Sequence, residues 1–396
     1  MLPNGWKKVK LGDVVKMSSG GTPSKDNASF WNGDIPWISA LEMHKNFVEE
    51  AKLNITEDAL KKGSSLAKKN DLLLLTRGSM LWKRIPVCLC LRDVAFNQDV
   101  KCLHANEKLN STFLLYWFGC MEPKIMHMVV GTGIGAGKLE SSGILDLDVN
   151  LPPLEEQKKI AATLSVWDSA IEKMEKLIDA KESLLTEYGK ELFGRTEQKQ
   201  NENWSTIALS DVLNEHGDKS TGKEEVFSVS VHKGLVNQIE HLGRSFAAKD
   251  TSNYNRVHYG DIVYTKSPTG DFPLGIVKQS LVKEDVIVSP LYGVFTPKTF
   301  ELGAILDFYF SSPINANNYL HPVAQKGAKN TINITNKKFL SAKLRLPIDI
   351  KEQKKIAQFV QTTKKEMAVL QEILENYKKQ KRGLMQKLIT GQWRVK

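Results

Sequence analysis

The sequence of 396 residues lacks any long apolar run. Its longest aliphatic run is Leu72 to Leu75, whereas a helix needs about 20 apolar residues to span a bilayer. The first residues, 1–8, contain no apolar stretch of the kind that forms a signal peptide. We therefore expect a cytoplasmic protein with no membrane partner.

Cysteine is scarce, and all four cysteines lie in the first half of the chain: Cys88, Cys90, Cys102 and Cys120. The run 87–91 around the first two is apolar and predicts a buried strand. No close Cys-x-x-Cys or His-x-x-x-His pair accompanies them, and the eight histidines are scattered. The sequence therefore predicts free thiols and no metal site.

Nucleotide-binding motifs are incomplete. Residues 131–138 read GTGIGAGK, but Thr132 stands where a P-loop needs glycine, and Leu139 stands where it needs serine or threonine. A helix-like segment, 113–128, precedes this stretch, whereas a dinucleotide site follows a strand. We predict that the chain binds no cofactor of its own.

Catalytic motifs are missing as well. Glu156-x-Lys158 and Glu352-x-Lys354 resemble nuclease ligands, but both stand at predicted helix starts, where a carboxylate serves as a cap or complements the helix dipole. No stretch resembles the Asn-Pro-Pro-Tyr or Asp-Pro-Pro-Tyr motif of an adenine methyltransferase. Nothing assembles a nucleophile, a base and an orienting group, so we predict no catalytic residue.

Positive charge is in excess, with 55 Lys and Arg against 45 Asp and Glu and a formal net charge of +10. A positive field favours a polyanionic partner, because each neutralised phosphate releases condensed counterions. A solvated lysine-rich surface explains the charge equally well. Charge alone leaves both readings open.

The sequence contains an internal repeat. Residues 156–161, EQKKIA, return as residues 352–357, an offset of 196, and each copy follows a Leu-Pro pair. The beginnings of the two halves also match, at Trp6 and Trp204. Identical residues in one register indicate a duplicated architecture.

Each copy of this motif begins a long amphipathic helix with a seam at alternating spacings of four and three residues. This spacing is typical of a coiled coil, because 3.5 residues per turn keeps one face on a partner helix. Each seam includes one lysine whose aliphatic stem can pack. The seam residues are Ile160, Leu164, Trp167, Ile171, Met174, Ile178, Lys181, Leu185, Tyr188 and Leu192, and then Ile356, Val360, Thr363, Met367, Leu370, Leu374, Tyr377, Lys381, Leu384 and Leu388. We expect the two helices to pair with each other, although docking onto foreign helices remains open.

The chain is thus predicted to comprise two α/β modules and two helices: residues 1–152, a helix in 153–195, residues 196–346, and a helix in 347–396. Asp71–Leu75 and Asp261–Tyr264 are similar strand-like runs in the two modules. The modules share little else, so we infer related folds that have diverged around a common helical rod.

Polar stretches after these strands suit nucleic-acid contact, because Lys, Arg, Ser, Thr and backbone N–H groups bind phosphates while side chains on loops read bases. Each stretch could also be an ordinary polar turn. The candidate DNA-binding residues are Ser19, Gly20, Thr22, Ser24, Thr76, Arg77, Ser79, Lys83, Arg84 and Lys138 in the first module, and Lys266, Ser267, Thr269, Lys326, Lys329 and Asn330 in the second.

Several of these motifs together resemble the specificity subunit of type I restriction-modification systems. They are the Leu-Pro-Pro-Leu-Glu-Glu-Gln-Lys-Lys-Ile-Ala stretch at 151–161, Gly-Gly-Thr-Pro-Ser at 20–24, Gly-Asp-Ile-Pro-Trp at 33–37 and Asn-Gln-Asp at 97–99. The second module departs from the pattern, since it lacks Gly-Gly-Thr-Pro and has Val-Ser-Pro at 288–290 in place of Asn-Gln-Asp.

The resemblance implies two target-recognition domains joined by two antiparallel helices with pseudo-twofold symmetry. Each domain would read one half of a split, asymmetric site in double-stranded DNA, with the helices as a ruler. Two modification subunits would bring S-adenosylmethionine and adenine methylation, and restriction or translocase subunits would bring ATP and magnesium. The alternatives are an autonomous DNA methyltransferase or nuclease with a concealed active site, and a coiled-coil protein adaptor.

Overall fold

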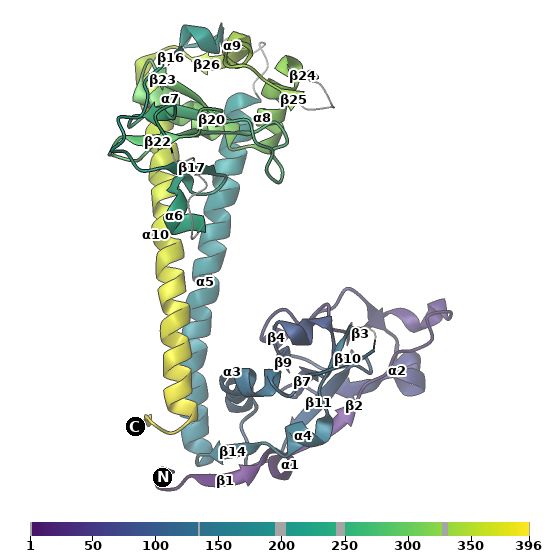
Figure 1. Ribbon diagram of the computed structural model, residues 1–396. Helices are drawn as coiled ribbons and strands as arrows, with labels where there is room; N and C mark the ends of the chain where they lie inside the picture. Colours follow the sequence, from purple (N-terminus) through teal and green to yellow (C-terminus); the bar gives the residue numbers. More distant parts are fainter. Residues whose placement is uncertain (1, 134, 195–202, 243–249, 327–331, 396) are drawn as a thin grey trace. The chain divides into compact units, whose positions relative to one another are not determined.

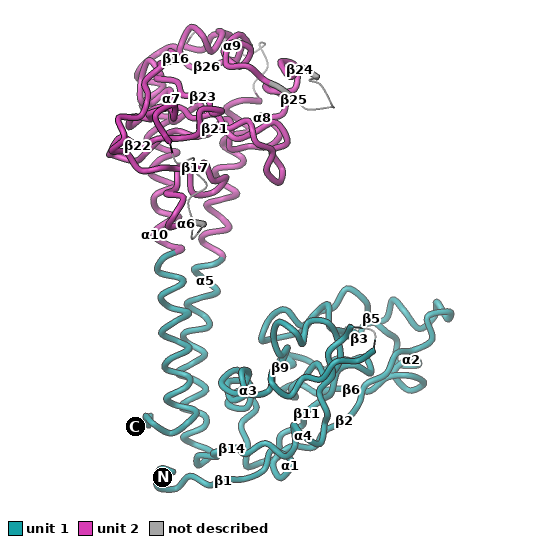
Figure 2. Tube along the Cα trace, viewed as in Figure 1, with its two compact units in different colours: residues 1–175, 372–396 teal, residues 176–371 magenta. Residues whose placement is uncertain are grey.

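The computed structural model describes residues 2–133, 135–194, 203–242, 250–326 and 332–395. The chain divides into two compact units, residues 1–175 with 372–396 (unit 1) and residues 176–371 (unit 2), as Figure 2 shows. Each unit contains one module and part of both long helices. Among the described helices, none is both long and apolar enough to cross a membrane.

The two predicted long helices are present (Figure 1). Helix α5 covers Leu154–Phe193 and α10 covers Ile350–Ile389, 40 residues each, or about 60 Å at 1.5 Å per residue. Asp349 caps α10, since its Oδ2 accepts from the N–H of Glu352 at 2.9 Å. Gly391, just beyond the end of α10, has a φ of +75°, a conformation that ends helices readily when the residue is glycine.

The helices pack against each other inside unit 1. The rings of Trp167 and Tyr377 meet edge to face, 5.5 Å apart, and Glu175 accepts from Lys378 at 2.9 Å. Asp168, one residue after Trp167, binds Lys381. Between the two ion pairs, the residue number rises from Asp168 to Glu175 on α5 and falls from Lys381 to Lys378 on α10, so the helices are antiparallel here.

Unit 2 repeats this arrangement. Lys181 donates to Glu366 at 2.6 Å, and the ring of Tyr188 lies 4.6 Å from that of Phe359. Along both helices every seam position is buried or half-buried. The two seams therefore face each other within each unit, and their two lysines, Lys181 and Lys381, have carboxylate partners as well as packed stems.

The first module is built around a five-stranded sheet, and its central strand is fully buried because all four of its leucines are inaccessible. A second sheet, a small three-stranded sheet and a terminal pair complete it. The five strands, in order, are β2 (Val15–Ser19), β11 (Val100–Ala105), β7 (Leu72–Leu75), β9 (Val87–Cys90) and β4 (Phe47–Val48). The others are β5 (Asn54–Ile55), β3 (Trp31–Ile38), β10 (Val94–Phe96) and β6 (Ser65–Ala67), then β12 (Val130–Gly131), β13 (Gly137–Lys138) and β8 (Arg77–Gly78), and the pair β1 (Lys7–Lys10) and β14 (Asp148–Leu151).

Helices and buried thiols complete this core. The helices are α1 (Leu11–Val14), α2 (Glu57–Gly63), α3 (Ser111–Met126) and α4 (Ser141–Leu145), with 3-10 turns η1 (Ala28–Phe30) and η2 (Ser79–Trp82). The predicted strand around Cys88 and Cys90 is β9, and all four cysteines are free, as the sequence predicts. Burial raises the pKa of the Cys88 thiol to about 12, so it packs as a neutral apolar group.

The second module has a four-stranded sheet with three strand pairs beside it and a terminal pair. The sheet order is β16 (Leu213–Glu215), β23 (Gly293–Pro297), β20 (Ile262–Thr265) and β21 (Ile276–Gln279). The pairs are β15 (Trp204–Ala208) with β26 (Lys343–Pro347), β17 (Phe227–Ser230) with β18 (Gly234–Asn237), β19 (Asn255–Val257) with β22 (Val286–Val288), and β24 (Gln325–Lys326) with β25 (Ile332–Asn333). The helices are α6 (Gln238–Leu242), α7 (Phe300–Phe310), α8 (Pro313–Leu320) and α9 (Asn336–Ser341), with η3 (Leu209–Asp211) and η4 (His321–Val323).

The two modules share one topology, as expected of diverged copies. The order β2-β11-β7-β9 in unit 1 corresponds to β16-β23-β20-β21 in unit 2, and in both modules the first strand pairs with the last. The buried aspartates Asp71 and Asp261 precede the equivalent strands β7 and β20, where each accepts from the N–H three residues earlier at 2.8 Å. The predicted relation between the two strand-like runs is confirmed.

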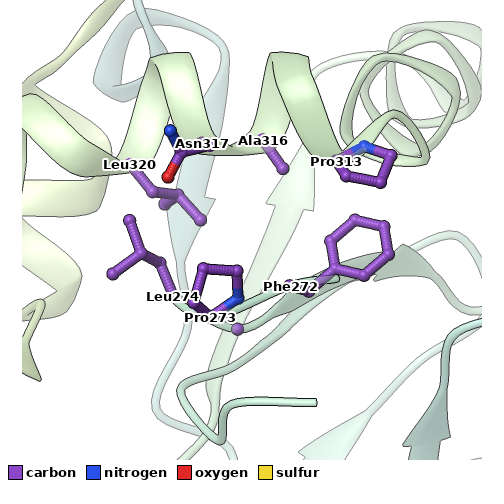
Figure 3. A pocket seen from close by; sticks show the side chains of 8 residues that line it. Phe272, Pro273, Leu274, Pro313, Ala316, Asn317 and Leu320 are labelled. Carbon is purple, nitrogen blue, oxygen red and sulfur yellow. The ribbon is translucent and has the colours of Figure 1, made fainter. Parts of the chain in front are cut away.

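An apolar crevice in unit 2 lies where α8 meets the turn at 272–275 (Figure 3). Phe272, Pro273 and Leu274 face Pro313, Ala316 and Leu320 across it. Almost no polar group lines this crevice, so it reflects helix packing. The predicted contact residue Thr269 is not part of its lining, although it pairs with Phe272 beside the crevice.

Candidate nucleic-acid interface

One end of the five-stranded sheet gathers the predicted contact residues of the first module. In the antiparallel ladders Ser19 pairs with Lys101, Leu75 with Val100 and Leu74 with Val87. The loops after β2, after β7, before β9 and before β11 therefore all leave the sheet at this end. We call these loops, residues 20–24, 76–79, 83–86 and 97–99, the loop end of unit 1.

Two cations stand opposite each other on the small sheet attached to this end. Arg77 on β8 pairs directly with Lys138 on β13. Directly opposite residues of an antiparallel pair share one face, where like charges destabilise the pair. Lys138 binds Glu140 at 2.7 Å, whereas the exposed guanidinium of Arg77 has no hydrogen-bond or ion-pair partner among the described residues. An anionic ligand such as a phosphate would relieve this repulsion.

An exposed aromatic side chain accompanies these cations. Trp82, at the end of η2, is 49% exposed, and its Nε1 donates to the carbonyl of Gly135 at 3.0 Å. Strands β12 and β13 pair antiparallel, so Gly133 and Gly135 of the glycine-rich stretch lie in the connection between them. Sequence reasoning missed Trp82, although its neighbours Lys83 and Arg84 were singled out.

The glycines at 20–21 are explained by close backbone packing. A Cβ on Gly20 would lie 2.2 Å from the carbonyl oxygen of Phe96, and one on Gly21 would lie 2.4 Å from that of Gly63. Thr22 follows them, and its Oγ1 lies 2.5 Å from Oε1 of the exposed Gln98, to which it donates. Gln98 can still offer its amide nitrogen, so the fold adds it as a candidate base-reading side chain.

Two of the predicted contact residues, Thr76 and Arg84, have hydrogen-bond partners within the module. Thr76 is only 5% exposed, and its hydroxyl donates to the carbonyl of Asp99 at 3.1 Å. The guanidinium of Arg84 donates to the carbonyls of Met43 and His44. Contact with a ligand would therefore have to compete with these internal bonds, and it stays a prediction for both residues.

The remaining candidates of the first module stay near the surface. Ser24, Ser79 and Lys83 are exposed. Ser19 is exposed too, and its Oγ accepts from Lys101 at 2.8 Å, so this lysine joins the positive charge at the loop end.

In unit 2 the corresponding stretch follows β20, the equivalent of β7. Ser267 and Thr269 are exposed, and Lys266 is half-buried beside Glu215. Burial lowers the pKa of Lys266, and the nearby carboxylate opposes this effect. Lys326 lies in β24, while the predicted Lys329 and Asn330 fall outside the described residues.

The glutamine of each repeated motif holds a module helix to the start of a long helix. Gln157 is fully buried, its Nε2 donates to the carbonyls of Lys108 and Pro152 at 2.9 Å, and its Oε1 accepts from the N–H of Asn110, the N-cap of α3, at 2.8 Å. In unit 2, Oε1 of Gln353 accepts from Thr299, the N-cap of α7, at 2.7 Å. In both copies, the glutamine of the motif thus joins the start of the long helix to the N-terminus of a module helix.

Glu156 has a different role from the predicted cap. Its carboxylate forms a two-pronged ion pair with Arg394, with contacts of 2.7 and 3.0 Å, and accepts from the indole of Trp6 at 3.2 Å. Hydrogen bonds from Arg394 lower the pKa of Glu156. The sequence could not reveal this partner, because it lies 238 positions away in the chain.

Comparison with known proteins agrees with this architecture. A family model described as the type I restriction modification DNA specificity domain matches residues 3–182 and 201–377. The EcoR124I/EcoR124II specificity subunit of Escherichia coli is 31% identical over 166 residues, 41% of each chain. The MjaVIII specificity subunit of Methanocaldococcus jannaschii is 24% identical, with all of this chain and 94% of that protein covered.

Coverage of the relatives varies. The match spans 41% of the Escherichia coli subunit and 63% of the MjaIX specificity subunit of Methanocaldococcus jannaschii, which is less than two thirds of either. Among solved structures, a type I restriction-modification S subunit from M. genitalium has the same fold, with a TM-score of 0.63 at 16% identity and 98% of both chains covered. The chain therefore belongs to the family of type I restriction-modification DNA specificity domains and carries two copies of that domain.

Proposed function

We propose that this chain is the DNA-reading subunit of a type I restriction-modification complex, in which each module reads one half of a split, asymmetric site. The repetition of one topology supports this, because both modules place polar loops after the same central strand. The observation that carries the proposal is the opposed pair Arg77 and Lys138 at the loop end of unit 1. Glu140 compensates the charge of Lys138, whereas Arg77 has no partner among the described residues and would be stabilised beside a phosphate.

Within this scheme the chain determines which DNA sequence is bound, and its partner subunits catalyse the reactions. Two modification subunits would bind S-adenosylmethionine and methylate adenine, and restriction or translocase subunits would bind ATP and magnesium. The chain would have no catalytic residue or cofactor of its own, in keeping with relatives that are named specificity subunits. The paired helices α5 and α10 would set the length of unread DNA between the half-sites.

Methylation mapping on the complex of the full chain with its modification subunit tests the division of labour. We expect Arg77→Ala to weaken binding and relax recognition in one half of the methylated sequence only. Substitution of Ser267 and Thr269 together by alanine should affect only the other half. Lys173→Ala, an exposed change on α5, is the matched control and should leave the sequence unchanged. Changes in both halves from one variant would refute independent readers.

Two other functions give different results in simple assays. An autonomous enzyme would methylate or cut DNA when the purified chain alone is incubated with DNA, magnesium and S-adenosylmethionine, and we expect no such activity. A coiled-coil protein adaptor would leave DNA binding by the complex intact after both modules are deleted. We expect that deletion to abolish sequence-specific binding.

A further inference from the structure

Unit 2 brings together three potential metal ligands from two segments that lie 40 positions apart in the sequence. His216 and Asp218 follow β16, and His258 follows β19. One ligand atom from each lies within 4.8 Å of the others, and this is the only such group found in the part of the chain that the structure describes. We propose that His216, Asp218 and His258 form a binding site for a Zn²⁺ ion.

Two of the three separations between the ligand atoms are close to those between donors around zinc. Oδ2 of Asp218 lies 3.0 Å from Nε2 of His258 and 3.8 Å from Nδ1 of His216. Donors bound tetrahedrally at about 2.0–2.1 Å from zinc are roughly 3.3 Å apart. Two imidazole nitrogens with one carboxylate oxygen also form a donor set that favours zinc over calcium or magnesium, which prefer oxygen alone.

Both histidines are oriented by carboxylates on their other ring nitrogens. Nε2 of His216 lies 2.9 Å from Oδ2 of the buried Asp261, and Nδ1 of His258 lies 2.8 Å from Oδ1 of Asp285. Histidine ligands of metals almost always donate in this way to an outer carboxylate or carbonyl, which fixes the tautomer and leaves the opposite nitrogen for the metal. The nitrogens left over here, Nδ1 of His216 and Nε2 of His258, are the two that converge on Asp218.

A hydrogen-bonded cluster without metal explains less of this arrangement. Nδ1 of His216 is buried and has no hydrogen-bond partner, although buried polar atoms normally have one. The surrounding charge also suits a divalent cation. Three aspartates, Asp218, Asp261 and Asp285, surround the histidines, and the nearby cation Arg256 lies 3.9 Å from Asp285 and from Glu224.

The site would strengthen a junction in unit 2 that already has backbone hydrogen bonds, such as the one from the N–H of Arg256 to the carbonyl of Asp218 at 2.9 Å. It connects the loop after β16 with the turn between β19 and β20, and through Asp285 with the start of β22. Asp218 and His258 are partly exposed, at 48% and 36%, so the ion can reach the site and water can complete its coordination. Because the ligands come from two segments, the ion would hold these segments together, at a place separate from the loops that follow β20.

Calorimetric titration of the chelator-treated full chain with ZnCl₂ tests the proposal. We expect one Zn²⁺ per chain, a rise in Tm of roughly 5–10 °C at a hundredfold excess over Kd, and the visible absorption of tetrahedral Co²⁺ after substitution of the metal. Asp285→Asn should weaken binding about 10–100-fold. His258→Gln and Asp218→Asn, which remove ligands, should each weaken it by more.

His104→Gln is the matched control, because His104 also contacts a buried aspartate, Asp71, the counterpart of Asp261, 2.6 Å away, but belongs to no ligand group found among the described residues. It should leave zinc affinity unchanged. Circular dichroism checks that each variant folds, and the partly exposed Asp218 gives an independent test if His258→Gln does not. Absence of zinc binding, or equal affinity in wild type, His258→Gln and Asp218→Asn, would overturn the proposal.

Discussion

Replacing Gln157 by leucine tests what the repeated Glu-Gln motif contributes to the fold. Leucine has nearly the volume of glutamine, so the change removes hydrogen bonds and opens little space. Three bonds disappear, from Nε2 to the carbonyls of Lys108 and Pro152 and from the N–H of Asn110 to Oε1. All three backbone groups lose their partner at a site where the side chain itself is fully buried.

The expected cost follows from these contacts. A net loss of about 0.5–1.5 kcal/mol per hydrogen bond, with the added desolvation penalty of unsatisfied buried groups, gives about 3–5 kcal/mol for Gln157→Leu. The matched change Gln353→Leu removes two bonds, to the carbonyl of Pro347 and from the hydroxyl of Thr299. Thr299 also caps α7 through the N–H of Leu302 and keeps that bond, so we expect about 1–3 kcal/mol there.

Urea denaturation measures the loss, and hydrogen exchange locates it. The amide of Asn110 should lose protection in Gln157→Leu and keep it in Gln353→Leu. Lys159→Ala, an exposed change two residues along α5, should stay within about 0.5 kcal/mol of wild type. A loss below 1 kcal/mol for Gln157→Leu, or unchanged protection at Asn110, would show that the motif does not hold the module to the helix.

Three further predictions concern the ion pairs and the helices. Arg394 lowers the pKa of Glu156, so this carboxylate stabilises the fold above its unfolded pKa of about 4.3 and loses the effect as pH falls through its folded pKa. The difference in unfolding free energy between wild type and Glu156→Gln should therefore be largest near pH 7 and shrink in acid. A difference that stays constant with pH in denaturation experiments would contradict this. Lys381→Met leaves Asp168, 21% exposed, without its cation and should lower the unfolding free energy measured in urea by about 1–3 kcal/mol. Lys378→Met breaks a more exposed ion pair and should lower it by less than about 1 kcal/mol. Insertion of one heptad into both α5 and α10 at the junction of the units keeps the seam and lengthens each helix by about 10 Å. Methylation mapping should then find the unread DNA between the two half-sites longer by about 3 base pairs. An unchanged spacing would show that the helices do not set this distance.

The periodic and repeated features could be predicted from the sequence. The seams of α5 and α10 follow from local spacing, and their ends follow from residues such as Asp349 and Gly391 that act within one turn. The buried strands β7 and β20 follow from short apolar runs after an aspartate. These features depend on neighbours in the chain, which a sequence displays directly.

The membership of the candidate interface was only partly predictable. Arg77 and Lys138 were separate candidates, and only the pairing of β8 with β13 placed them opposite each other. Thr76 and Arg84 carry suitable polar groups, yet the fold satisfies both internally. Gln98 became a candidate base-reading residue because Thr22 binds its amide oxygen and leaves its amide nitrogen available.

The sequence by itself determined two related modules, two seamed helices and a chain rich in positive charge. Tertiary structure decided which polar groups stay available, which glutamine holds each module to its helix, and that His216 and His258 meet at Asp218. The physical reason is the distance along the chain over which each interaction acts. Periodicity and capping act over a few residues, whereas hydrogen-bond partners and ligand sets are chosen by strand register and packing between segments that lie tens to hundreds of residues apart.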